Sequence, residues 1–220
     1  YGLSLGFALA AMYFLFNQKS KTTYDQYIKA LSLSLLFSML SAYSNLVCIN
    51  LNITLMLVFV LELIPLVRDK IILLDKKKIL SIAMVFGLNL VLLSFLVVRL
   101  LFLKEHKELY HGGTEGFIKS TLSVLIHRSI YFSYYGEAFW LRIRLVLLIL
   151  FVLTLIYQIV SKVYSNLSRI TLILLIMVSG SVLQHIIFDA LYPLERTSII
   201  FVPIIGLFIY YLILDIYSKL

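Results

Sequence analysis

Length, composition and charge exclude an ordinary soluble domain. Of the 220 residues, 62% are hydrophobic and 14% are charged, whereas about a quarter of the residues in a soluble domain are charged. So few charged side chains cannot cover an apolar core, and the composition therefore indicates an integral membrane protein. The net charge of +8 suits contact with anionic membrane lipids, and no nucleic-acid partner is expected.

Seven apolar runs predict an all-α, polytopic transmembrane helix bundle, since one span needs about 20 apolar residues. The region 27–65 is too long for one span, and the cluster of Asn45, Asn50 and Asn52 divides it into a hairpin with its tip at 44–52. The predicted spans, in chain order, are 1–16, 28–43, 53–67, 79–103, 140–161, 170–191 and 199–217. Together they predict a single membrane domain, 1–220.

The chain begins inside an apolar run at Tyr1, without an initiator methionine or a preceding basic region. A secretory signal peptide would carry such a basic region. We therefore expect that 1–220 is the C-terminal part of a longer membrane protein.

The distribution of basic residues predicts the orientation of the bundle. With seven spans the loops alternate between two sides, and one side carries the denser basic segments, among them Lys76, Lys77 and Lys78. The positive-inside rule places this side in the cytoplasm. The loop 104–139, the hairpin tip and the turn 192–198 then share the extracytoplasmic face.

The loop 104–139 is the longest polar interruption of the chain. A long loop of mixed polarity usually covers or builds a site, and Gly112 and Gly113 let the backbone approach a ligand closely. Apolar residues at helical spacing between 116 and 131 predict a helix in the membrane interface; the alternative is a structural lid without substrate contact. Three histidines lack the close spacing of metal ligands, so no metal is expected: His106, His111 and His127.

Three polar residues near the last turn are candidates for substrate contact. Arg196 precedes the final span, and its fixed guanidinium suits a phosphate; the alternative is an interfacial anchor paired with Glu195. His185 and Asp189 lie four residues apart on the preceding helix and share one face. They form either a pair that handles a proton or contacts substrate, or a polar pair that faces the bundle interior.

Three stretches carry a family resemblance: YGLSL at 1–5, YHGGTEGF at 110–117 followed by KSTLSVL at 119–125, and YPLERT at 192–197 with Pro203 in the last span. Together they resemble the C-terminal half of bacterial glycosyltransferases of the GT-C class, similar to dolichyl-phosphate-mannose mannosyltransferase-like proteins. The resemblance implies a sugar transfer on the outer face of the bacterial plasma membrane. The donor would be a polyprenyl-phosphate-linked sugar, and the acceptor a glycan, lipid or protein.

The same resemblance implies roles for particular positions. In such enzymes an acidic residue in the first external loop acts as base or metal ligand, and that loop would lie upstream of Tyr1. No cofactor is therefore expected within this chain, and the catalytic residue and any divalent metal are expected upstream. Arg196 would hold the lipid phosphate, with His185 and Asp189 on the same face. A wall of the substrate site would come from Tyr110, His111, Gly112, Gly113 and Glu115.

Three other functions fit the sequence. A transporter or flippase of a lipid-linked or small anionic substrate would more often show broken helices and paired charges near the midplane, whereas the charges here cluster near the ends of spans. A polymerase or ligase of cell-surface glycans would share the donor class and the face. A scaffold subunit without catalytic activity is the third alternative.

Overall fold

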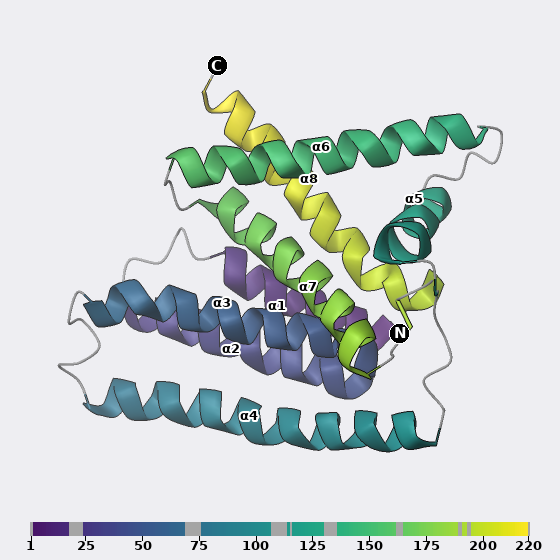
Figure 1. Ribbon diagram of the computed structural model, residues 1–220. Helices are drawn as coiled ribbons and strands as arrows, with labels where there is room; N and C mark the ends of the chain where they lie inside the picture. Colours follow the sequence, from purple (N-terminus) through teal and green to yellow (C-terminus); the bar gives the residue numbers. More distant parts are fainter. Residues whose placement is uncertain are drawn as a thin grey trace. The chain divides into compact units, whose positions relative to one another are not determined.

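The computed structural model (Figure 1) describes residues 2–17, 24–68, 76–106, 114, 116–129, 136–161, 165–188, 191–192 and 195–219. Regular structure in these residues is helical, as the sequence predicts. The α-helices are α1 (Gly2–Phe16), α2 (Tyr24–Ser44), α3 (Ile49–Arg68), α4 (Lys76–Glu105), α5 (Ser123–Ser129), α6 (Glu137–Ser161), α7 (Asn166–Phe188) and α8 (Phe201–Tyr217). Shorter helical segments are η1 (Leu46–Cys48) and η3 (Glu195–Ile200), both 3-10, and the π-helical η2 (Ile118–Leu122).

Five apolar stretches in the described residues are long enough to cross a membrane, which indicates an integral membrane protein. They are Leu46–Ile64, Ile79–Glu105, Ala138–Ser161, Asn166–Ile187 and Ser198–Tyr217. Their outer faces carry exposed apolar side chains such as Val98 and Ile159, as lipid contact requires. Helix α1 has only 15 residues, and five of the 21 residues of α2 are serine, which lowers its hydropathy.

The chain divides into two compact units, 1–108 with helices α1 to α4 and 109–220 with helices α5 to α8. In the first unit, α1 packs closely on α2 because small buried side chains, among them Ala8 and Ala11, let the two backbones approach. The Ser41 hydroxyl of α2 donates a hydrogen bond to the Ser4 carbonyl of α1 at 2.8 Å, which links the two helices directly.

The break between α2 and α3 lies in the predicted hairpin, but its tip is shorter than expected. Asn45 adopts an extended backbone (φ −157°), and its side chain caps η1 by accepting a hydrogen bond from the Val47 amide. Helix α3 already begins at Ile49, so the expectation that the tip extends to 52 is wrong. Asn50 and Asn52 are buried helical residues.

The amide nitrogen of Asn52, on α3, has partners on two other helices. Its Nδ2 donates to the Ser38 hydroxyl of α2 at 2.9 Å and to the Asn89 carbonyl oxygen of α4 at 3.4 Å. All three side chains are buried, where unpaired polar groups are costly. The Asn52 amide therefore links α2, α3 and α4 in the core of the first unit.

Candidate functional site

An apolar cavity lies within the second unit, between the segment η2–α5 and helices α6, α7 and α8. Its volume is about 190 Å³, and all but one of its lining residues are apolar. The η2–α5 wall begins at Phe117, and helix α8 contributes Phe201 and Phe208. The remaining lining residues are Ile118, Thr121, Leu122, Leu125, Leu147, Leu148, Phe151, Leu174, Val178 and Ile205. An apolar cavity of about 150 Å³ takes benzene, so this one has room for a short stretch of hydrocarbon chain.

Aromatic contacts join the start of the helical segment 117–129 to the turn between α7 and α8. The ring of Phe117 lies 5.3 Å from that of Phe201 and 6.5 Å from that of Tyr192. On its other side Tyr192 stacks on His185 at 4.5 Å. Immediately before Phe117, Gly116 has φ +91°, a conformation that glycine adopts without the steric penalty of a side chain. The segment after Gly116 thus forms one wall of the cavity.

Arg144 of α6 lies where α6 meets this segment. Its Nη1 donates to the Ser123 hydroxyl at 2.7 Å and its Nε donates to the Trp140 carbonyl at 3.3 Å. Ser123 in turn donates to the Ile118 carbonyl at 2.8 Å, a bond across five residues that the π-helical geometry of η2 allows. The Ser123 hydroxyl is therefore oriented with its oxygen toward the guanidinium.

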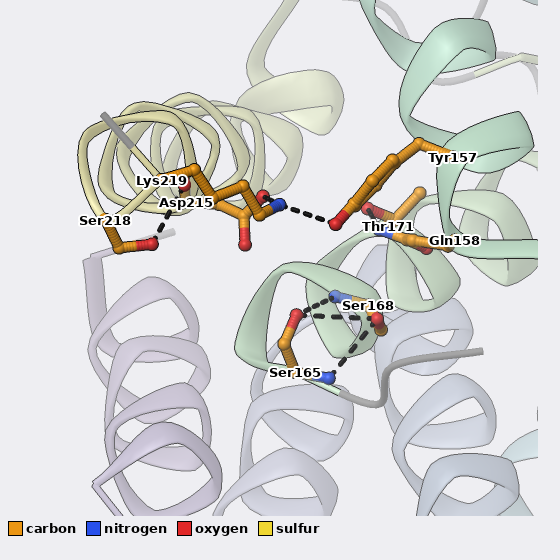
Figure 2. Close-up of polar contacts among 8 residues, drawn as sticks. All are labelled: Tyr157, Gln158, Ser165, Ser168, Thr171, Asp215, Ser218 and Lys219. Atoms are coloured by element: carbon orange, nitrogen blue, oxygen red, sulfur yellow. Dashed lines mark hydrogen bonds and ion pairs between the residues drawn. The ribbon is translucent and has the colours of Figure 1, made fainter. Parts of the chain in front are cut away.

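The other end of the second unit is polar and its groups bond to one another (Figure 2). Lys219 pairs with Asp215 and donates to the Tyr157 hydroxyl at 2.6 Å, and Gln158 donates to the Thr171 hydroxyl at 3.0 Å. The hydrogen bond to Asp215 raises the pKa of Lys219. These contacts join α6 to α7 and to the end of α8, at the far end of the helices from Arg144.

The structure places the residues predicted for the site as follows. His185 lies on α7 and stacks on Tyr192, and the backbone of Arg196 lies in η3, which contacts α5. The side chain of Arg196 is outside the described part of the chain. The remaining predicted positions lie outside the described residues: Asp189, Tyr110, His111, Gly112, Gly113 and Glu115.

Arg144 was not among the residues predicted for the site, because an arginine in the first turns of a span ordinarily extends to the lipid headgroups. A signal was present in the spacing. Arg144, Leu147, Leu148 and Phe151 are separated by three and four residues and share one face of α6. The three apolar members of that face line the cavity.

Among the described residues, no group of three or more histidine, cysteine, aspartate or glutamate side chains is arranged to hold a metal ion. Comparisons with protein-family models, with curated proteins and with solved structures gave no match. Function is therefore inferred from the cavity, the aromatic residues at one of its walls and Arg144 beside it.

Proposed function

We propose that the chain is the seven-span C-terminal part of a GT-C-like membrane glycosyltransferase. It transfers a sugar from a polyprenyl-phosphate donor to a glycan, lipid or protein acceptor on the outer face of the bacterial plasma membrane. The observation that supports this proposal is the apolar cavity, with the non-spanning segment 117–129 as one wall and with α5 against η3, the segment that contains Arg196. A donor with an isoprenoid chain and a phosphate needs an apolar chamber for the chain and a cation for the phosphate.

The reaction needs few groups. The acceptor hydroxyl attacks the anomeric carbon, the bond from that carbon to the phosphate oxygen breaks, and its electron pair stays on the lipid phosphate. The proton of the hydroxyl passes to a carboxylate base that we expect upstream of Tyr1. Arg196 stabilises the negative charge that grows on the leaving phosphate, which is where a fixed guanidinium contributes most.

Replacing Arg196 with alanine in the full-length protein tests this role. We expect kcat/KM for transfer from a polyprenyl-phosphate sugar to fall about 30-fold, which corresponds to roughly 2 kcal/mol of transition-state stabilisation. Arg196→Lys should retain part of the rate, because the charge remains without the bidentate geometry. Arg142→Ala, at an exposed position of α6, serves as the control. Unchanged transfer by Arg196→Ala would leave Arg196 as an interfacial anchor.

Transport of a lipid-linked or small anionic substrate is less well supported. Helices that bind substrate in transporters are commonly broken near the membrane midplane. Here α3, α4, α6 and α7 run without a break through their apolar stretches. Continuous helices favour a substrate site at the ends of the helices, as expected for an enzyme, over a transport site at the membrane midplane.

The seven-span arrangement predicts the sides of two exposed positions. Along the chain, three helices lie between Asn17 and Thr114: α2, α3 and α4. Asn17→Cys and Thr114→Cys should therefore react with a membrane-impermeant thiol reagent from opposite sides of oriented vesicles. The native Cys48 is buried and should contribute little labelling. Reaction of both positions from the same side would mean that α2 does not cross the membrane.

A further inference from the structure

Arg144 is a cation without a carboxylate partner among the described residues. Both of its hydrogen bonds go to neutral oxygen atoms, those of Ser123 and of the Trp140 carbonyl. A guanidinium has five N–H donors, so three remain for a further ligand. An anion that accepts two parallel hydrogen bonds would satisfy both the charge and the geometry.

Arg144 lies within the apolar stretch of α6 and beside the cavity. The apolar stretch of α6 begins at Ala138, so Arg144 lies about 9 Å further along the helix axis. Leu147 and Leu148, one turn onward, line the cavity, and so does Leu122, the neighbour of Ser123. Because helical side chains lean toward the helix N-terminus, the guanidinium lies at the edge of the cavity and not within it.

We propose that the cavity and Arg144 together bind a phosphate-bearing lipid, with its apolar chain in the cavity and its phosphate on the guanidinium. Phosphate offers several oxygens in the geometry that a guanidinium fork matches. Ser123 acts as a positioning residue, since its hydroxyl is fixed by the Ile118 carbonyl and holds Nη1 in place. The choice of a polyprenyl phosphate as that lipid rests on the proposed function, whereas the site itself needs only a chain and a phosphate.

Trp140 provides a direct test of binding. It is the single tryptophan of the chain, it is buried, and its carbonyl bonds to Arg144. The full chain is reconstituted in phosphatidylcholine nanodiscs, and phosphatidic acid with brominated acyl chains is added in small amounts. Saturable quenching of Trp140 fluorescence by the brominated phosphatidic acid is expected, at much lower mole fractions than by brominated phosphatidylcholine.

Two pairs of variants localise the site. Arg144→Gln should weaken the saturable quenching about tenfold, whereas Arg142→Gln, with the same loss of charge at an exposed position, should not. Val178→Phe fills the cavity and should also weaken binding, whereas Leu175→Phe, exposed on the same helix, should not. Far-UV circular dichroism confirms that each variant is folded, and the Val178 pair decides the question if Arg144→Gln does not fold.

Competition by unlabelled lipids separates the two sources of phosphate. If a polyprenyl phosphate relieves the quenching at a lower mole fraction than phosphatidic acid does, the ligand is an isoprenoid lipid. If phosphatidic acid relieves it at the lower mole fraction, the ligand is a diacyl lipid. Equal quenching by brominated phosphatidylcholine, or equal losses in Arg144→Gln and Arg142→Gln, would overturn the proposal. Sugar transfer is not measured here, so lipid binding and the proposed enzymatic activity can fail independently.

Discussion

Replacing Phe59 with alanine is expected to lower the free energy of unfolding by about 3 to 5 kcal/mol, the range for large buried aromatic side chains. Phe59 is 1% exposed and is the largest of the fully buried side chains among the described residues. Its ring lies 6.2 Å from that of Phe86 of α4 and nearly parallel to it, with an angle of 16°. In a membrane, packing of this kind supplies much of the attraction between helices, because lipid tails are as apolar as the core. The loss of stability therefore comes mainly from van der Waals contacts that are no longer made in the space vacated by the Phe59 ring.

The measurement is reversible unfolding of the chain in mixed micelles, as a function of the mole fraction of a denaturing detergent. Phe95→Ala is the matched control, since Phe95 is also on a long apolar helix but is 62% exposed. Its loss should stay below about 1 kcal/mol, as for most exposed positions. Equal losses for the two variants would contradict the packing of α3 on α4 around Phe59.

Asn52→Ala is expected to cost about 2 kcal/mol of unfolding free energy, because it leaves two buried groups without their partner. Ser38 loses a donor at 2.9 Å, and the Asn89 carbonyl oxygen loses one at 3.4 Å. Hydrogen bonds between helices in membranes contribute about 0.6 kcal/mol on average and up to about 1.7, and the cavity that alanine leaves adds to this. The same detergent titration measures the effect.

A double-mutant cycle with Ser38→Ala isolates the hydrogen bond from the cavity. The coupling free energy between positions 38 and 52 should be about 1 kcal/mol, in the range for directly bonded pairs. Ser94→Ala is the control, since Ser94 is exposed on α4 and bonds only to its own helix, through the Val91 carbonyl. A coupling near zero would show that the Asn52 amide does not link α2 to α3.

Hydropathy predicted the helical class and five of the seven spans, which are apolar helices long enough to cross a membrane, because each needed only a long apolar run bounded by polar residues. The division of 27–65 was also predictable, since Asn45 interrupts the pattern and caps the next helix. The residue at which that interruption ends, and α3 begins, was not predictable. Asn50 and Asn52 resemble turn residues in sequence, and only partners 14 and 37 residues away keep Asn52 inside a buried helix.

The site was predictable in part. The helical spacing between 116 and 131 indicated a helix, and the structure has helical residues from Phe117 to Ser129. The π-helical start of that segment leaves no signal in hydrophobic periodicity, yet it sets the direction of the Ser123 hydroxyl. The bond from Arg144 to Ser123 spans 21 residues, so no local pattern could reveal it. The placement of that helix in the membrane interface stays a prediction.

The length of α4 has a consequence for the membrane itself. Its apolar run from Ile79 to Leu103, in which Arg99 is the single charged residue, has 25 residues and is therefore about 37 Å long. The hydrocarbon layer of a typical bilayer is only about 30 Å thick. This hydrophobic mismatch is relieved by tilting the helix or by local thickening of the bilayer. The tilt of α4 should therefore depend on acyl-chain length, with short-chain lipids forcing the helix to tilt further than long-chain lipids do.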